Sequence, residues 1–400
     1  MDRKWISTGV DALAVLVYAM LFLYPAIPYG AAVTLTLSIS VFALSVLDDR
    51  STLKVKPSAF YLYVLAVVGY CCLSALWEYD AGRALPVGMS LLKTTLVIFP
   101  VFAAYQNRQS TTPLVNAMLW GGYLACAVIV VLYNPVKLVM LSVTGVRIDN
   151  TFLNANTIGL VAAVTAIVHL HMILQRRKLK WIDVLLVFVI WILAISGSKK
   201  ALLFLIGGYF LLFIFKSLDG KNSLRRVLFT VAVLAAITIA VIMLPIFDHM
   251  RFRLKSMVLS LLEGPSTESS TNLRLLYMQV GLQAFFQNPL FGIGMDSSWK
   301  LVEQTVGTAA YLHCNYVELL ACGGIVGFIL FYSIYGYLGT CLFRLRHNRD
   351  AYYPLIVTLF VLLLVMDVAM VSYYNKETYF YLLLLYLYVQ ELKTKKGIAK

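Results

Sequence analysis

The feature that most constrains this chain is a series of apolar runs, most of them about 20 residues long, separated by polar segments. A run of that length crosses a bilayer as a helix, because lipid offers exposed backbone groups no hydrogen-bonding partner. The sequence therefore predicts an all-α integral membrane protein with about 12 transmembrane helices. Their approximate limits are 6–28, 31–47, 59–78, 85–105, 114–136, 157–174, 181–198, 200–218, 227–247, 315–343, 351–374 and 376–392.

The composition supports this class and excludes several others. Of the 400 residues, 61% are hydrophobic and only 13% are charged, whereas a soluble globular chain is about 25% charged. A cytosolic enzyme, a disordered regulator and a secreted disulfide scaffold are therefore excluded. Asp2, Arg3 and Lys4 precede the first run and no small-residue cleavage site follows it. We expect this run to be a retained helix.

The distribution of positive charge predicts the orientation. The net charge is +14. With twelve spans, one class of loop holds 21 Lys and Arg residues and the opposite class holds 11. The positive-inside rule then places both termini in the cytoplasm. Basic clusters such as 176–180 are interpreted as topology signals that also contact anionic lipid. Because the spans interrupt these clusters, we expect no nucleic-acid partner.

One polar segment, residues 248–314 between the ninth and tenth spans, is far longer than the other loops, and the topology places it outside. We expect residues 1–400 to form a single polytopic membrane domain that carries this long helical loop. Within the loop, residues 250–262 read as an amphipathic helix on the outer leaflet. A second helix is expected at 272–287, capped by Thr271 or Asn272 and stopped by Asn288 and Pro289.

Two residues of this loop are candidate catalytic groups. Arg274 is expected in the first helical turn, where a cation opposes the helix dipole, so anion binding explains it better than helix stability. His313 lies where the tenth span begins, and a neutral imidazole there could accept a proton from an attacking hydroxyl. The alternatives are a solvated surface arginine and a boundary histidine without a catalytic role.

Further charged residues stand out because they lie deep within a predicted span or on the outer side of the membrane. Lys93 lies near the middle of the fourth span, where a charge is costly, and is a candidate for ligand binding. A structural pair with Asp367, at a similar depth, is the alternative. The outward cations oppose the positive-inside trend and predict an anionic ligand, for which the pyrophosphate of a lipid-linked donor is the natural candidate. They are Arg147, Lys199, Lys200, Arg251, Arg253 and Arg274.

Four segments in order resemble the O-antigen ligase and Wzy-type polymerase superfamily of bacterial membrane glycosyltransferases. They cover roughly residues 150–330 and comprise an asparagine-rich segment at 150–159, a Ser-Gly-Ser turn at 196–203, a loop helix and glycine turn at 273–294, and the signature at 313–327. The signature positions are His313, Tyr316, Gly324 and Gly327. The turn departs from the family in having Lys199 in place of arginine. Cys314 also departs from the usual residue, and Asn315 is expected to substitute for it.

The resemblance implies a GT-C-like, metal-independent, inverting glycosyltransferase without a cofactor. Its donor would be a glycan on undecaprenyl pyrophosphate and its acceptor a second glycan, at a site that faces the periplasm or exterior of the bacterial cytoplasmic membrane. Arg274 and His313 would be the catalytic residues. Besides membrane lipids, the family suggests a chain-length regulator and a flippase as partners. The expected substrate-binding residues are Lys93, Arg147, Asn154, Asn156, Lys199, Lys200, Asn315 and Tyr316.

The favoured function is a polymerase that joins lipid-linked repeat units of a surface polysaccharide such as O-antigen, capsule or exopolysaccharide. The first alternative is a ligase that moves the finished glycan to lipid A core. The second belongs to another class, a secondary transporter or lipid-oligosaccharide flippase, which twelve spans would suit. Transporters are often built from repeated halves, and no convincing repeat relates the two halves of this sequence.

Overall fold

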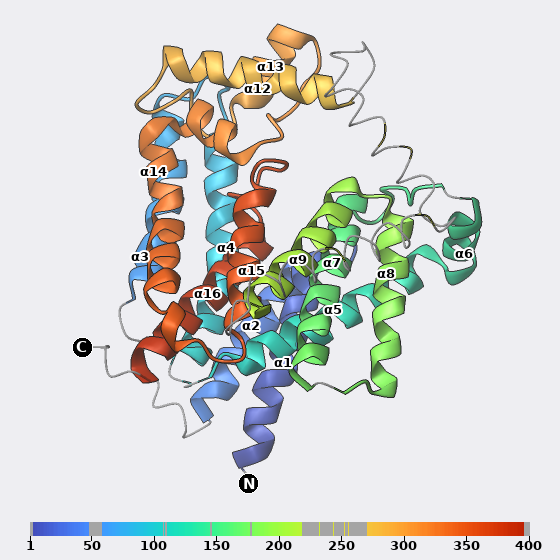
Figure 1. The fold of residues 1–400 in the computed structure, drawn as a ribbon. Coiled ribbons are helices and arrows are strands. Elements are labelled where there is room, and N and C mark those ends of the chain that lie inside the picture. The colour runs from blue at the N-terminus through green and yellow to red at the C-terminus, as the bar shows by residue number, and fades with distance from the viewer. Residues whose placement is uncertain are drawn as a thin grey trace. The chain divides into compact units, whose positions relative to one another are not determined.

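The computed structural model describes residues 3–47, 58–106, 108, 110–144, 146–176, 178–217 and 270–395, together with the isolated residues 232, 243, 252 and 255. Every regular element in these residues is a helix, which confirms the all-α class (Figure 1). The chain divides into two compact units, each assembled from separate stretches of sequence, and they are described one at a time.

Unit 1 comprises residues 1–51, 108–256 and 348–362. At its centre α7 packs against α5, α8 and α9, while α1 packs against α2 and α5. Most of α7 is buried, as expected of a helix that is apolar on all sides. The helices are α1 (Arg3–Leu23), α2 (Gly30–Leu47), α5 (Thr112–Tyr133), α6 (Pro135–Thr144), α7 (Ala155–Arg176), η2 (Trp181–Val184), α8 (Leu185–Ser196), α9 (Lys199–Ser217) and the first part of α15 (Tyr353–Met366).

Small residues set the helix spacing in unit 1. A Cβ atom on Gly122 of α5 would overlap the hydroxyl of Thr165 on α7 and lie 3.0 Å from its Cβ. On α9, a Cβ atom on Gly208 would collide in the same way with Ile167 of α7. Helices in membranes associate through such close approach, because lipid removes the hydrophobic driving force between them.

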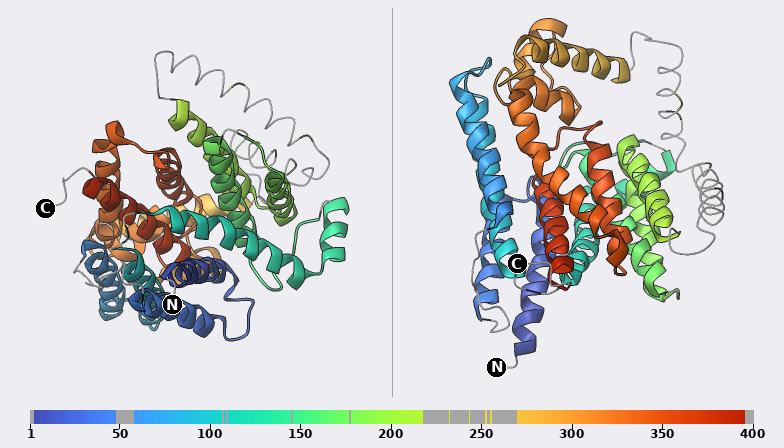
Figure 2. Two further views of the ribbon diagram at one scale, coloured as in Figure 1. Left: turned by 90° about the horizontal axis from the view of Figure 1, so that it is seen from below. Right: turned by 60° about the vertical axis from the view of Figure 1, so that its left-hand side comes forward.

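Unit 2 comprises residues 52–107, 257–347 and 363–400. Figure 2 shows α3 and α4 side by side, and α14 packs against α3 and α16. In Figure 1, α12 and α13 lie across the end at which α14 begins. The helices are α3 (Ala59–Leu73), η1 (Ser74–Leu76), α4 (Ala84–Tyr105), α12 (Ser270–Gln287), α13 (Ser298–Val306), α14 (Asn315–Arg344), η4 (Arg346–Asn348), the end of α15 and α16 (Lys376–Lys395).

Eleven of the twelve predicted spans overlap helices, although the eleventh, 351–374, corresponds to a helix that already ends at Met366; the ninth, 227–247, lies outside the described residues apart from two isolated positions. Eight of the described helices are long and apolar enough to cross a membrane. Three apolar helices are shorter: 135–144, 181–196 and 353–366. The chain is thus a multi-pass membrane protein, while the count of twelve stays a prediction.

The long polar segment agrees with the sequence in part. The helix expected at 272–287 is α12, which ends before Asn288 and Pro289 as predicted. The predicted caps were wrong, because α12 begins at Ser270 and contains both Thr271 and Asn272. Several consecutive Ser, Thr and Asn residues precede Arg274 and each can cap a helix, so the sequence does not single one out. The helix expected at 250–262 lies outside the described residues.

The contact between α5 and α7 provides a test of the packing in unit 1. Gly122→Ala should destabilise the protein by about 1–3 kcal/mol, because the new methyl group overpacks against Thr165. The measurement is thermal unfolding in detergent. Gly336→Ala is the matched control, since a Cβ there meets nothing within 4 Å. Equal melting temperatures for the two variants would contradict the close packing.

Candidate active site

In unit 2, aromatic rings surround His313, the last histidine before α14. The ring of Tyr311 lies with its centroid 4.0 Å from the imidazole. The ring of Tyr277 stacks on the imidazole at 6.0 Å, with an interplanar angle of 17°. Tyr277 lies on α12 one turn after Arg274, so the two predicted catalytic residues come from neighbouring parts of the same unit. The imidazole is half-buried between the two phenol rings.

The positive charge of Arg274 acts on this cluster through Tyr311. Burial raises the pKa of the Tyr311 phenol above its usual value, and the nearby Arg274 guanidinium partly opposes this rise. The hydroxyl is therefore neutral at physiological pH and can donate a hydrogen bond. Arg274 can therefore act with this phenol on an anion, and the imidazole that contacts the same phenol can accept a proton.

The backbone of His313 adopts a left-handed conformation, with φ of 60°. Such a conformation costs energy for a residue with a Cβ and persists only where its surroundings hold it. Glu318 supplies one restraint, because its Oε2 accepts the backbone N–H of Leu312 at 2.9 Å. Its Oε1 accepts the hydroxyl of Ser298, at the start of α13, at 2.6 Å. One fully buried carboxylate thus joins α13, the His313 turn and α14.

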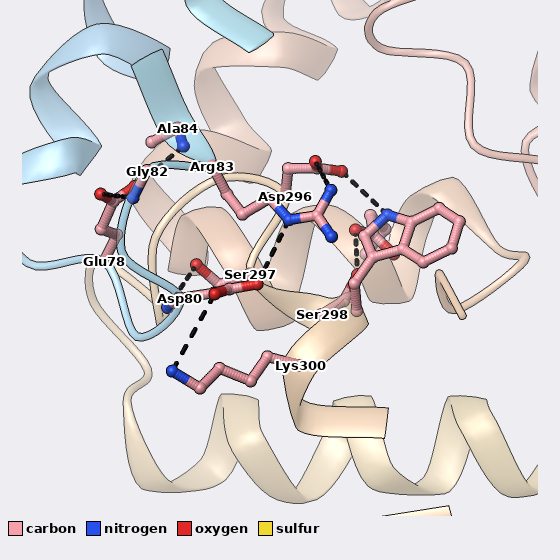
Figure 3. A network of polar contacts seen from close by, with 11 residues as sticks. Glu78, Asp80, Gly82, Arg83, Ala84, Asp296, Ser297, Ser298 and Lys300 are labelled. Carbon is pink, nitrogen blue, oxygen red and sulfur yellow. Dashed lines mark hydrogen bonds and ion pairs between the residues drawn. The ribbon is translucent and has the colours of Figure 1, made fainter. Parts of the chain in front are cut away.

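A second polar network holds the turn between α12 and α13 (Figure 3). Arg83 lies at the start of α4, donates to Asp80 at 3.2 Å and pairs with Asp296 at 3.7 Å. Asp296 also accepts from the indole N–H of Trp299 at 3.2 Å. Lys300 lies 4.0 Å from Asp80. The turn that precedes the His313 segment is therefore anchored by charge to the turn between α3 and α4.

The glycines of the family signature have a structural reason in unit 2. Gly324 breaks α14, with φ of 61° and ψ of −169°, and a side chain there would collide with Leu290. The break frees backbone groups on α14, and the 289–294 loop pairs with them. The N–H groups of Ile293 and Gly294 donate to α14 carbonyls at 2.9 Å, and two α14 N–H groups donate back to Pro289 and Leu290.

The remaining candidates in unit 2 are Asn315, Tyr316 and Lys93. Asn315 is fully buried. Its Oδ1 accepts the N–H groups of Ser372 and Tyr373, and its Nδ2 donates to Tyr332 and Asp367. These bonds occupy the amide and favour a structural role.

Tyr316 and Lys93 differ in exposure. The Tyr316 ring stacks on Tyr332, and its hydroxyl donates to the carbonyl of Leu364 at 2.8 Å. Lys93 is exposed on α4, near the positive charge of Lys376.

The alternative of a Lys93–Asp367 pair was wrong. Asp367 accepts hydrogen bonds from Tyr332 at 2.8 Å, Ser372 at 2.5 Å and Asn315 at 3.3 Å. Among the residues that the structure describes, no ion pair joins it to Lys93. Neutral hydrogen-bond donors from neighbouring segments satisfy this carboxylate instead, a solution that hydropathy alone does not reveal.

Unit 1 gathers the other predicted residues at one end. Arg147 donates from Nε to the carbonyl of Ser196 at 3.1 Å and lies 3.5 Å from Oδ1 of Asn156. The same oxygen of Asn156 accepts the hydroxyl of Ser198 at 2.9 Å. Asn154 accepts the N–H of Asn156 at 2.8 Å and so caps α7. Lys199 and Lys200, both half-buried, begin α9 directly after this turn.

Comparison with known families agrees with this arrangement. Residues 184–332 match the family model of O-antigen ligase. The match confirms the predicted resemblance to the O-antigen ligase and Wzy-type superfamily. It includes Lys199, Lys200, Arg274, His313, Asn315 and Tyr316, whereas Lys93, Arg147, Asn154 and Asn156 precede it. No curated protein matches the chain.

The structure adds residues that the sequence analysis missed. Glu318 has the same signal as Lys93 and Asp367, since it is a charge within a predicted span, and such charges are functional candidates. Tyr277 and Tyr311 carry no comparable signal, because 25 tyrosines occur along the chain. The short helix α13 was missed because its nine residues are fewer than the window over which a helical apolar period can be recognised.

Glu318 allows a test of how the His313 turn is held. Glu318→Ala should lower stability by about 1–3 kcal/mol for each group left unpaired, the Ser298 hydroxyl and the Leu312 N–H. Glu318→Gln should stay close to wild type, because its amide oxygen can accept from Leu312 while its NH₂ donates to Ser298. Thermal unfolding of both variants measures the difference. Equal loss in both would contradict the hydrogen-bonding role.

Asp296 predicts a pH dependence. Burial, partly offset by the Arg83 charge, raises the pKa of Asp296 from 3.8 to about 6. The folded protein therefore holds this proton more tightly than the unfolded chain. The resulting stabilisation, on the order of 2–3 kcal/mol, is fully present below about pH 4 and is lost as the pH rises to 6.

Asp296→Asn mimics the protonated side chain at every pH. The melting temperature of the wild type relative to this variant should therefore rise as the pH falls from about 6.5 to 4. Because both proteins carry the other carboxylates, the difference isolates Asp296. A difference that does not change across this range would show that the proton does not bind there.

Proposed function

We propose that this protein transfers a glycan from undecaprenyl pyrophosphate to a hydroxyl group of a second lipid-linked glycan, and so polymerises the repeat units of a surface polysaccharide. The observation that carries the proposal is the cluster of Arg274, Tyr311 and His313 inside the segment that matches the O-antigen ligase family. Its place of action would be the outer face of the bacterial cytoplasmic membrane.

In the proposed reaction, His313 accepts the proton of the acceptor hydroxyl as the oxygen attacks the anomeric carbon. A new carbon–oxygen bond forms while the bond to the pyrophosphate oxygen breaks, and undecaprenyl pyrophosphate leaves with the electron pair. Attack opposite the leaving group inverts the anomeric configuration. Arg274 offsets the negative charge that develops on the pyrophosphate, and the neutral Tyr311 hydroxyl can donate to the same group.

For unit 1 we propose that Arg147, Lys199 and Lys200 bind anionic groups of the lipid-linked substrates. This proposal is supported by their positions, because these three cations come from two parts of the chain and lie at one end of the unit, beside the Ser196–Ser198 turn. Asn154 and Asn156 would hold this end in place, because both use their side-chain oxygens within it. Lys93 is proposed as a separate contact to lipid-linked substrate, since it is exposed on an apolar helix.

A ligase that transfers the finished glycan to lipid A core is the second candidate, and the description of the matched family favours it. Both reactions use the same donor and differ in the acceptor. We favour the polymerase partly because the turn at 198–201 reads Ser-Lys-Lys-Ala, with Lys199 at the position where the resembling turn of the family has arginine. A chain-length regulator and a flippase are proposed as partners from the family resemblance.

The test uses purified protein in nanodiscs with an undecaprenyl-pyrophosphate-linked repeat unit, with and without a lipid A core acceptor. Longer lipid-linked products support the polymerase, and transfer to the core supports the ligase. His313→Ala should reduce either product about 10²–10⁴-fold, the usual contribution of a general base. Arg274→Ala should reduce it about 10²–10³-fold. Mass spectrometry of the extracted lipids provides the measurement.

Matched controls separate chemistry from folding. His347→Ala and Arg346→Ala remove an exposed histidine and an exposed arginine and should keep wild-type activity. Arg147→Gln should raise the apparent KM for the donor more than it lowers kcat. Full activity in folded His313→Ala or Arg274→Ala would overturn the role of that residue. Absence of both products in the wild type would overturn the proposed function.

A further inference from the structure

A cavity of about 360 Å³ opens in unit 1, apart from all residues assigned to the proposed reaction. It lies between the first half of α5, the end of α7 and the start of η2. Its lining combines two cations with aromatic and aliphatic side chains. The residues that matter to the argument are Trp120, Tyr123, His169, Arg176, Lys180 and Trp181.

The basic part of the cavity is built around the carboxylate of Asp183, whose side chain is 8% exposed. Asp183 accepts from Arg176 at 2.5 Å and from the ring Nε2 of His169 at 2.9 Å, and its other oxygen accepts the backbone N–H of Lys180 at 2.7 Å. The other ring nitrogen of His169 is hydrogen-bonded to the hydroxyl of Tyr123. Both His169 and Tyr123 are buried. This network orients the Arg176 guanidinium at the cavity while leaving part of its donor fork for a ligand.

The charge of the cavity favours a ligand that carries a single negative charge. Arg176 and Asp183 offset each other, and Lys180 adds one positive charge, so these three side chains together carry a net charge of +1. Because a guanidinium presents a planar fork and an ammonium a point charge, the pair matches the oxygens of a phosphate diester.

The walls of the cavity indicate the kind of molecule to which this phosphate belongs. Leu119, Met172 and Ile182 line the cavity together with the two indole rings, and Trp181 is 84% exposed. Tryptophan at the end of a membrane helix is typical of the lipid headgroup level. The cluster of Arg176, Lys178 and Lys180 lies at the same end of the helices, which the positive-inside rule predicts to be cytoplasmic.

We propose that this cavity binds the headgroup phosphate of an anionic glycerophospholipid, with the lipid chains along the apolar wall. The chemistry is that of phosphatidylglycerol, which carries one phosphate diester charge and no amine. A water-soluble phosphate would meet the same cations but would gain nothing from the indole and aliphatic walls. The site is independent of the proposed glycan transfer, since no residue of the two overlaps.

The experiment measures lipid binding by native mass spectrometry and by thermal unfolding of the full-length protein in neutral detergent. Added phosphatidylglycerol should form a one-to-one adduct and raise the melting temperature, because it binds the folded state. The double variant Arg176→Gln, Lys180→Gln should bind it about 25-fold more weakly, from roughly fivefold for each basic residue near a lipid headgroup. Arg344→Gln, at another helix end, is the matched control and should bind like the wild type.

Lys180→Gln alone keeps the Arg176–Asp183 pair and should bind about fivefold more weakly, which preserves the test if the double variant does not fold. Trp120→Ala should also weaken binding, whereas inorganic phosphate should not raise the melting temperature. Equal stabilisation by phosphatidylcholine would overturn the preference for an anionic headgroup. Equal stabilisation by inorganic phosphate would show a soluble-anion site, and unchanged affinity in Lys180→Gln would place the lipid elsewhere.

Discussion

The break in α14 at Gly324 is the constraint on which the rest of unit 2 depends. A helix that ends its hydrogen bonding inside a membrane leaves backbone groups that lipid cannot satisfy. Here the 289–294 loop satisfies them in both directions, donating from Ile293 and Gly294 and accepting from two α14 N–H groups. Glycine is required at the contact because a side chain on Gly324 would collide with Leu290. The exchange fixes the loop that leads from α12 to α13.

With that loop in place, the His313 turn is held from several sides. Glu318 binds the N–H of Leu312, while the N–H of Asn315 donates to the carbonyl of Asp367 at 2.7 Å. The unusual left-handed backbone of His313 therefore lies between two fixed hydrogen bonds. In the proposed reaction His313 is the general base, and such support matters there because small displacements of a general base strongly reduce the rate. Glu318 and Asp367 therefore act mainly by holding the His313 turn in place through hydrogen bonds.

Hydropathy and loop composition were sufficient to predict the all-α membrane class, most helix limits and the boundary at His313. This is because a membrane helix is recognised from the length of its own apolar run. The pairing of Arg274 with His313 in one unit was predicted only through the family resemblance. Contacts between distant segments could not be predicted. The partners of Asp367 come from α14 and residue 372, and those of Glu318 from α13 and residue 312. The break in α14 was not predicted either, because the sequence marked Gly324 only as a position of the family signature.

The turn at 196–200 contains no arginine, but a guanidinium from elsewhere in unit 1 lies beside it. Lys199 stands where the resembling turn has arginine, and lysine lacks the planar fork that matches phosphate. Arg147 supplies that guanidinium: its Nε donates to the Ser196 carbonyl, and its side chain packs where a Cβ on Gly197 would collide with it. A guanidinium is thus present at this turn although the turn itself does not encode one. If anion binding in unit 1 needs the fork, Arg147→Lys should impair it more than Lys199→Arg, which would add a second fork at the same place.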